Sequence, residues 1–313
     1  MKLGVVMDPI GSIDFKKDST LAILLEAQAR NHEIYYMEPS SLFLKEDGAF
    51  GLTHLIEVKD DSKSWYNLSE IKETRLADLD VILMRQDPPF NTNYIYNTYI
   101  LEAAEKQGTL VVNKPRSLRD CNEKVFATHF PQCCAPFLVT SKEELIKEFL
   151  EIHKDIILKP LDGMGGSSVF RIKNKDTNLN VIIETVTNNF ATKIMIQKYI
   201  PEIKQGDKRI LLIEGHPMPA AIARIPTEGE LRGNLAAGAS AVARSLTDRD
   251  LWICAQLKAE LERLGLVLVG LDIIGDFLTE INITSPTCFK EYKSLCDLDV
   301  ASSLLDCLEK KIN

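Results

Sequence analysis

The sequence predicts an α/β and α+β fold, in which an N-terminal domain with a parallel sheet precedes two further lobes. Strand-like and helix-like patterns alternate through residues 1–121, as they do in parallel sheets covered by helices. Later strand patterns are joined by short turns, as in hairpins. The length of 313 residues suggests about two domains. We expect boundaries at 1–121, 122–201 and 202–313.

The N-terminal domain owes its predicted elements to apolar periodicity. Leu21, Leu24 and Leu25 fall on one helical face, and Gly108 ends a second helical pattern as a cap. Residues 35–65 are less regular and are interpreted as an insertion or a hairpin. The predicted strands are 3–7, 33–37, 81–84 and 109–112, and the predicted helices are 19–30 and 94–107.

The two later units show shorter elements. Ser141 with Glu144 three residues on matches a capping box for a helix. The stretch 226–245 is polar, contains glycine and is long for a compact domain, so we expect a lid loop there. The predicted helices are 117–130, 181–189, 247–265 and 300–311. The predicted strands are 137–140, 155–160, 167–173, 195–200, 209–214, 220–225, 267–274 and 278–283.

Composition narrows the classes of function. The chain is 45% hydrophobic and 26% charged, as in globular proteins, with a formal charge of −8. Nucleic acids and anionic membranes require basic surfaces, so neither is an expected partner. No segment suits a membrane span or a signal peptide. The seven cysteines are odd in number and scattered, which indicates reduced thiols in a cytoplasmic protein.

A glycine-rich turn is the most informative local feature. Lys159 ends a predicted strand, and Gly163, Gly165 and Gly166 follow before the next strand. Glycines let backbone N–H groups approach phosphate oxygens closely. The Walker A loop and the dinucleotide fingerprint are both absent. We interpret the turn as a cover over a triphosphate; the alternative is an ordinary hairpin turn.

A predicted hairpin carries oxygen ligands for a metal ion. Glu280 and Asn282 alternate with isoleucines, so both point to one face of a strand. With Asp272 they offer the carboxylate and amide oxygens that suit Mg²⁺. A two-residue turn at 275–276 would place Asp272 and Glu280 on opposite faces, so a shared site needs a bulged or longer turn. The alternative is the polar outer face of an exposed hairpin.

Four cations, Lys124, Arg209, Arg224 and Arg232, complete the candidate site. Each taken alone is interpreted as a surface charge. Beside a phosphate loop and paired carboxylates, they supply the positive charge that a transferring phosphoryl group and substrate carboxylates require. The five histidines are far apart and have no metal-ligand spacing, so we treat them as structural.

These residues resemble those of bacterial glutathione synthetases, which are ATP-grasp enzymes. The lysine–glycine loop and the Glu-x-Asn pair are typical of the ATP-grasp superfamily. Arg-x-Asp-Pro-Pro-Phe and Glu-Ile-Asn-x-Thr-Ser-Pro-Thr point to glutathione synthetase itself. The matching segments are 8–9, 85–90, 113–115, 157–166, 232–238 and 280–287, so the resemblance covers nearly the whole chain.

The resemblance implies a Rossmann-like N-terminal domain on the substrate side, followed by the small and large lobes of an ATP-grasp domain. It also implies roles for individual residues. ATP would be bound by Lys124, Lys159, Gly163, Met164, Gly165, Gly166, Gln197, Tyr199, Ile200, Asp207 and Asn234. Two Mg²⁺ ions, for which Mn²⁺ can substitute, would be held by Asp272, Glu280 and Asn282. Catalysis would use Arg209, Arg224 and Arg232, and substrate contacts would come from Arg85, Arg224, Arg232 and Ser285.

The implied reaction is the ATP-dependent ligation of γ-glutamylcysteine and glycine to glutathione through an acyl phosphate. A homo-oligomer, a tetramer by resemblance, is implied as well. The alternatives are another ATP-grasp carboxylate–amine ligase, such as a D-alanine–D-alanine or glutamate-adding enzyme, and a non-catalytic ATP-binding regulatory protein. The lid departs from the family, which usually continues as Gly-Gly-Arg after Ala237; here Gly238–Ala239–Ser240–Ala241 follows, and Arg244 is a candidate replacement.

Overall fold

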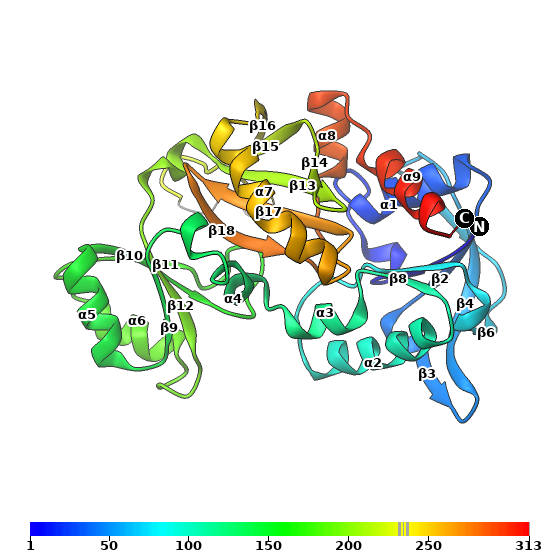
Figure 1. The fold of residues 1–313 in the computed structure, drawn as a ribbon, viewed down its shortest axis with the longest axis horizontal. Coiled ribbons are helices and arrows are strands. Elements are labelled where there is room, and N and C mark those ends of the chain that lie inside the picture. Colours follow the sequence, from blue (N-terminus) through cyan, green and yellow to red (C-terminus); the bar gives the residue numbers. More distant parts are fainter. Residues whose placement is uncertain (231–232, 234, 236–237, 313) are drawn as a thin grey trace.

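The computed structural model describes residues 1–230, 233, 235 and 238–312, and its N-terminal part forms a mixed sheet (Figure 1). Strands β2, β1, β7 and β8 are parallel neighbours in that order. β4 extends the sheet antiparallel to β2 and also pairs with β3, β5 and β6. The strands are β1 (Lys2–Val6), β2 (Glu33–Met37), β3 (Leu42–Lys45), β4 (Gly48–Val58), β5 (Tyr66–Leu68), β6 (Lys72–Arg75), β7 (Val81–Met84) and β8 (Leu110–Val112).

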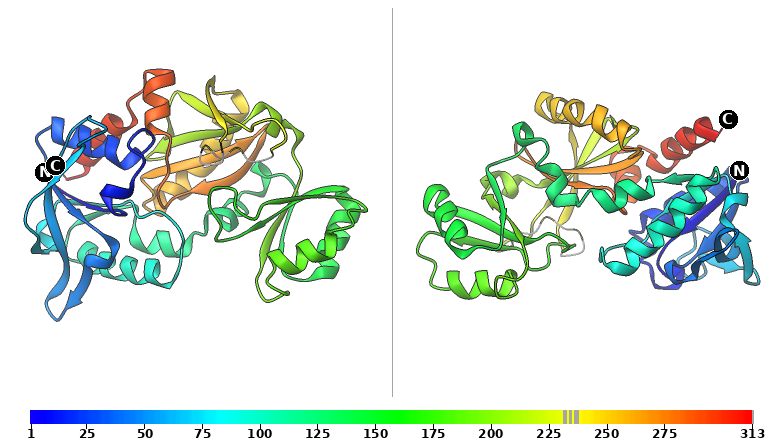
Figure 2. Two further views of the ribbon diagram at one scale, coloured as in Figure 1. Left: turned by 180° about the vertical axis from the view of Figure 1, so that it is seen from behind. Right: turned by 60° about the horizontal axis from the view of Figure 1, so that its bottom comes forward.

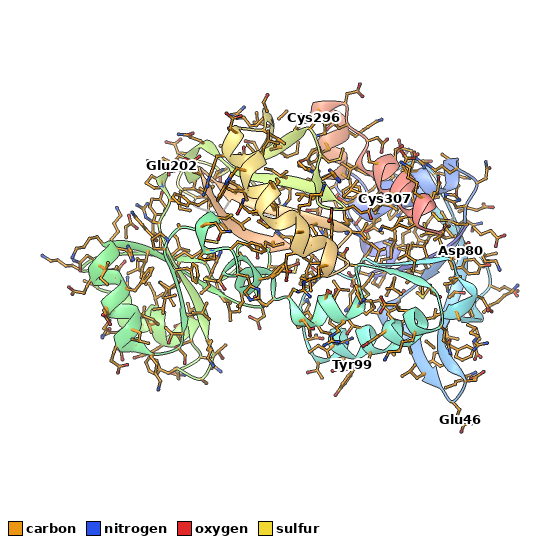
Figure 3. All side chains as sticks on the ribbon, in the orientation of Figure 1. Glu46, Asp80, Tyr99, Glu202, Cys296 and Cys307 are labelled. Atoms are coloured by element: carbon orange, nitrogen blue, oxygen red, sulfur yellow. The ribbon has the colours of Figure 1, made fainter. Side chains whose placement is uncertain are left out.

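The parallel strands are buried on both faces. Leu3 and Val5 of β1 share an apolar layer with helix α1, whereas Val6 belongs to the layer that contains Tyr94 and Leu101 of α2. Successive side chains of a strand point to opposite faces, which explains why these runs are apolar throughout. The helices of this part are α1 (Ser19–Ala29), α2 (Thr92–Lys106) and α3 (Pro115–Asp120). The β3–β4 hairpin, with Glu46 at its tip, extends away from the body (Figure 3).

A second, antiparallel sheet has the strand order β11-β10-β12-β9. Ile156 and Leu158 of β10 pack under helices α5 and α6 with a core of their own, drawn only from residues 138–196. The alternate side chains, Ile157 and Lys159, therefore point to the opposite, helix-free face. The elements are β9 (Phe137–Thr140), α5 (Glu143–His153), β10 (Asp155–Pro160), β11 (Phe170–Lys173), α6 (Leu179–Val186) and β12 (Ile194–Lys198).

A third, antiparallel sheet has the order β16-β15-β13-β17-β18, with β14 beside β13. Helix α7 covers one face, where Ile210, Leu271 and Ile281 pack against Leu257. The strands are β13 (Asp207–Ile213), β14 (His216–Pro217), β15 (Ala220–Ile225), β16 (Ser240–Ser245), β17 (Leu268–Ile274) and β18 (Phe277–Asn282). The helices are α4 (Glu123–Ala127), α7 (Asp248–Arg263), α8 (Phe289–Cys296) and α9 (Val300–Ile312).

The N-terminal sheet and the third sheet share their apolar cores, whereas the second sheet has a separate one. One core joins α2 and β7 to β13, β17 and α7, and another joins α1 to α8 and α9. Arg30, the residue that follows α1, adds ion pairs to Asp306 at 2.7 Å and Glu309 at 3.2 Å on α9. The second sheet stands apart from this body and connects to it through α4 and the 3₁₀ turn η5 (Pro201–Gln205), which carries Glu202 (Figures 2 and 3).

Four shorter 3₁₀ turns complete the described chain: η1 (Ile10–Ser12), η2 (Pro39–Ser41), η3 (Leu76–Asp78) and η4 (Pro131–Cys133). In the described ranges, no helix has both the length and the apolar character needed to cross a membrane.

Three local predictions are wrong. The helix expected over 117–130 is broken at Asn122, whose side chain accepts hydrogen bonds from the N–H groups of Lys124 and Val125 and so starts α4 anew. The capping box at Ser141 does not form, because α5 begins at Glu143 after Lys142, which has no capping side chain. The stretch 226–245 is not loop throughout, because Ser240–Ser245 form β16. Helix α8 was not predicted at all.

Candidate active site

A cleft of about 410 Å³ lies between the helix-free faces of the second and third sheets. The second sheet contributes Lys159 and Gln197, and the third contributes Arg209, Asp272 and Glu280. All belong to the alternate positions of strands whose other side chains are buried under helices. Of the predicted site residues, the cleft is lined by Lys124, Lys159, Gly163, Met164, Gly165, Gly166, Gln197, Tyr199, Ile200, Asp207, Arg209, Arg224, Asp272, Glu280, Asn282 and Ser285.

Lys159 of the second sheet contacts the third sheet. Its Nζ donates a hydrogen bond to the backbone oxygen of Thr279 at 3.1 Å, and the side chain is buried. Burial lowers the pKa of Lys159, and the negative charge of Glu280 opposes that shift. In the described chain no carboxylate lies within ion-pair distance of Lys159. A buried cation without an ionic partner suits a site that receives an anionic ligand.

The hairpin of β17 and β18 contains the bulge that a shared metal site requires. The turn itself is short, with Ile274 opposite Phe277. The register then shifts, so that Thr279 is the extra residue and Asp272 lies opposite Glu280. Thr279 Oγ1 donates to the backbone oxygen of Asp272 at 3.1 Å and secures the bulge. Asp272, Glu280 and Asn282 therefore share the cleft face of the sheet.

Asp272 lies within a buried network of charges. Arg209 binds it through two hydrogen bonds of 2.6 and 3.1 Å, and Arg224 reaches it at 2.9 Å. Arg224 also pairs with Asp207 at 2.6 Å. Burial alone would raise the pKa of Asp272, but the two guanidinium groups outweigh it and hold that pKa below its ordinary value. Burial raises the pKa of Asp207 to about 6, against the attraction of Arg224.

Lys124 connects the glycine loop to the hairpin. Its Nζ lies 2.9 Å from Glu280 and donates to the backbone oxygen of Gly163 at 2.7 Å. Burial lowers the pKa of Lys124, but Glu280 more than offsets this, so the pKa is raised. Because the helix is broken at Asn122, the side chain of Lys124 lies in the cleft. The periodicity of the sequence did not predict that break.

The ligand set fits a magnesium ion shared with phosphate oxygens. Within the described residues, no group of three or more histidine, cysteine or acidic side chains could hold a metal alone. Glu280, Asn282 and Asp272 offer oxygens on one face, and Asn282 donates its amide hydrogen to the Gly270 oxygen at 3.1 Å, which leaves its Oδ1 available. Such a partial shell suits Mg²⁺, because Mg²⁺ completes its octahedron with waters and phosphates.

The glycine loop has the backbone geometry that only glycine adopts cheaply. Gly165 and Gly166 have φ angles of +63° and +75°, and a Cβ at Gly165 would meet nothing within 4 Å. Backbone conformation, and not lack of space, is therefore the constraint at Gly165. Also in the cleft, the guanidinium of Arg171 lies 3.5 Å over the ring of Tyr199, whose hydroxyl has no hydrogen-bond partner among the described residues.

Arg85 is not among the residues that line the cleft, and two further predicted residues lie outside the described part of the chain. Arg85 is buried and its guanidinium donates to Thr20 Oγ1 at 3.2 Å and to the Pro286 oxygen at 3.0 Å, without lining the cleft. Arg232 and Asn234 lie outside the described residues. Arg244 cannot replace a lid arginine from its strand position, because it is exposed and sits opposite Ala221, on the face of the sheet away from Arg224.

Sequence reasoning missed Glu123, Asn113 and Arg171. Glu123 accepts three hydrogen bonds from the segment after Asn282. Asn113 joins the end of β8 to the third sheet through hydrogen bonds to the oxygens of Leu268 and Ile283, both 2.7 Å. The available signals were that Asn113 lies in a matching segment and that Glu123 directly precedes Lys124, since the hydrogen-bond partners of both are more than 150 residues away.

Residues 123–297 match a family model described as an ATP-grasp domain, which together with the fold and the cleft defines an ATP-grasp ligase. Solved structures with this fold include D-cycloserine synthetase DcsG (TM-score 0.70, 14% identity, all of both chains) and the ATP-grasp ligase PsnB bound to a minimal precursor (TM-score 0.67, 19% identity, 100% and 99% of the chains). D-alanyl-alanine synthetase A from Vibrio cholerae is also similar, with a TM-score of 0.61 and 14% identity over 99% and 98% of the chains.

The chain belongs to the prokaryotic glutathione synthetase family. Residues 1–119 match the family model described as its N-terminal domain, and residues 123–297 match its ATP-grasp domain. Glutathione synthetases from Vibrio parahaemolyticus and Pseudomonas aeruginosa are each 52% identical to the chain. The matches cover 100% of this chain and 99% and 98% of those proteins, respectively.

Proposed function

We propose that the protein joins γ-glutamylcysteine to glycine at the expense of ATP, and so forms glutathione. The observation that supports this proposal most directly is that Lys159, the glycine loop and the Glu280–Asn282 pair face one cleft from two different sheets. Family membership and full-length relatives named glutathione synthetase support the choice of substrates.

The cysteinyl carboxylate oxygen would attack the γ-phosphorus, ADP would leave, and an acyl phosphate would form. The glycine nitrogen would then attack the acyl carbon, and the carboxylate oxygen would depart with phosphate. Of the three ammonium protons, one stays on the amide, one is carried by phosphate and one is released. Catalysis of this kind is mostly positioning and charge neutralisation.

Each part of the cleft has a proposed task. Lys124 and Lys159 would neutralise the phosphates beneath the 163–166 loop, and Arg209 would face the transferring phosphoryl group. Gln197, Tyr199 and Ile200 would contact the base, with Asp207 near the ribose. Arg224, Arg232, Ser285 and Arg85 would serve the dipeptide, and Asn234 the nucleotide. Arg224 must then exchange one of its two carboxylate partners for substrate.

Asp272, Glu280 and Asn282 would hold two Mg²⁺ ions, which Mn²⁺ could replace. When bound, the metal neutralises phosphate charge and orients the γ-phosphoryl group. We further propose the three-domain division at 121 and 201, with a lid within 226–239 that excludes water from the acyl phosphate. A cytoplasmic location and a homo-oligomer, a tetramer in the family, follow from the resemblance; exposed Tyr96 and Tyr99 on α2 are candidate contacts.

A coupled assay of ADP release tests the function. ADP should form with ATP, Mg²⁺, γ-glutamylcysteine and glycine, and mass spectrometry should find glutathione. D-alanine, and a peptide ending in glutamate offered with free glutamate, serve as competing substrates. Turnover only with one of these would replace the proposal by another ligase. ATP binding without ADP from any pair would make the protein a non-catalytic nucleotide binder.

A further inference from the structure

Glu123 is a carboxylate at the edge of the cleft without a cation partner in the described chain. Its Oε1 accepts hydrogen bonds from Ile283 N at 2.9 Å, Thr284 N at 3.0 Å and Thr284 Oγ1 at 2.8 Å. Oε2 has no hydrogen-bond partner among those residues. Lys124, its chain neighbour, is turned to Glu280 and Gly163 instead. A partly buried carboxylate without an ion-pair partner suits a cationic ligand.

The surroundings of Glu123 are acidic. Burial, followed by the negative charge of Glu280, raises the pKa of Glu123, while the hydrogen bonds from Thr284 and Ile283 oppose the shift. Asp87 also lines the cleft. Four of the lysines and arginines that line the cleft, Lys124, Arg171, Arg209 and Arg224, are already paired with carboxylates. The cleft wall at Glu123 is therefore suited to a positively charged part of a substrate.

A small recess opens from the cleft on the other side of Glu123. It measures about 30 Å³ and shares Pro88, Glu123, Lys124, Gly163 and Thr284 with the cleft. Its other walls are formed by Phe90, Leu118, Cys121, Asn122, Leu161 and Asp162. Asp162 thus gives the recess a second carboxylate beside Glu123. Two carboxylates at so small a recess suit an ammonium group, which needs only a few acceptors.

We propose that Glu123 Oε2 binds the ammonium group of the acceptor amino acid. This inference rests on the proposed function, because it assigns the acceptor of that reaction a place. The three hydrogen bonds to Oε1 fix the carboxylate on the segment that directly follows Asn282. The acceptor nitrogen would thereby be held at a fixed position relative to the proposed magnesium ligands and Ser285. Glu123 is thus a substrate-binding residue, whereas Thr284 and Ile283 position it.

Glu123→Gln tests the proposal, because glutamine keeps the shape and the acceptor oxygen but loses the charge. We expect the KM for glycine to rise about 10- to 100-fold, the range expected for one hydrogen bond to a charged group. The KM values for ATP and γ-glutamylcysteine and the Mg²⁺ activation constant should stay within about twofold of wild type. Glu260→Gln, which changes an exposed acid paired with Arg263, is the matched control and should behave as wild type.

Positional isotope exchange separates acceptor binding from phosphoryl transfer. With β,γ-bridge ¹⁸O-labelled ATP and γ-glutamylcysteine but no glycine, Glu123→Gln should scramble the label at the wild-type rate. Hydroxylamine, which is neutral at pH 7.5, should trap the acyl phosphate equally well in both proteins. An unchanged KM for glycine, a lost isotope exchange, or a raised Mg²⁺ requirement would each overturn the proposal. If Glu123→Gln does not fold, Glu123→Asp, which keeps the charge but shifts it, should still raise the KM for glycine.

The two proposals fail in different ways. Wild-type protein that makes no ADP with γ-glutamylcysteine and glycine would refute the proposed function. Normal wild-type turnover with an unchanged KM for glycine in Glu123→Gln would refute only the role of Glu123.

Discussion

Lys159 Nζ donates a hydrogen bond to the backbone oxygen of Thr279, the one residue that the β18 bulge adds to the hairpin. The same bulge places Asp272 opposite Glu280. This bulge thus places the proposed metal ligands on one face of the sheet. It also offers Lys159 of the opposing sheet a hydrogen-bond acceptor. The two sheets have separate cores, so this contact spans the cleft between them.

Lys159→Met should reduce ADP formation by at least about 100-fold without lowering the melting temperature. Within the described chain, the ammonium group of this buried lysine is held only by a backbone oxygen, so its removal also removes a desolvation cost. Steady-state assays and thermal unfolding measure the two effects. Lys147→Met, on an exposed face of α5 in the same lobe, is the control and should change neither. A large loss of stability in Lys159→Met would show that the lysine is structural.

Glu280→Gln should lower turnover by orders of magnitude and leave the fold intact. The amide is a weaker metal ligand, and Lys124 loses its ion-pair partner at 2.9 Å. Turnover as a function of Mg²⁺ and Mn²⁺ concentration, with circular dichroism of the same samples, checks this. Near-normal turnover in that variant would remove the metal role.

Arg224→Ala should destabilise the protein by about 3–5 kcal/mol, because it leaves Asp207 and Asp272 buried beside each other with one cation fewer. Chemical denaturation measures the loss. The double variant Arg224→Ala/Asp207→Asn should recover part of it, since one of the two like charges is gone. No recovery would mean that packing of the arginine, and not its charge, carries the stability.

Arg232→Ala should mainly damage use of the dipeptide and spare nucleotide binding. Arg232 lies outside the described residues, so this expectation rests on the family resemblance. The KM for γ-glutamylcysteine and the affinity for ATP measure the two effects separately. A drop in ATP affinity instead would refute the assignment.

Removal of divalent metal with EDTA should abolish ADP formation but shift the melting temperature by no more than about 2 °C. The two carboxylates among the proposed metal ligands have protein cations as partners, with Asp272 held by Arg209 and Arg224 and Glu280 by Lys124. Unfolding of the protein on chelation would contradict this pairing of charges within the protein. Calorimetry of metal-free and metal-loaded protein is the measurement.

Much of the fold was predictable because strong local patterns carry it. The strands at 33–37, 81–84 and 155–160 are apolar runs between turn signals, and the structure confirms them. The broken helix at Asn122 was not predictable from periodicity, since its apolar spacing continues across the break. Helix α8 begins after Cys288, a residue in the left-handed conformation, and no capping residue precedes it.

The site was only partly predictable for a related reason. The alternation of Glu280 and Asn282 with isoleucines predicted that they share one face. Counting residues around the turn predicted that a shared site needs a bulged or longer turn. The residue that forms the bulge could not be predicted, because Thr279 is fixed in that position by its contacts with Asp272 and Lys159. Glu123 was missed because its three hydrogen bonds join positions about 160 residues apart.

A crystal structure with Mg²⁺ and a non-hydrolysable ATP analogue tests the central claim most directly. The triphosphate should lie between Lys159 Nζ and the oxygens of Glu280 and Asn282, with residues 163–166 folded over it. A triphosphate bound elsewhere, or one that touches Lys159 while the metal sits away from Glu280 and Asn282, would contradict the account.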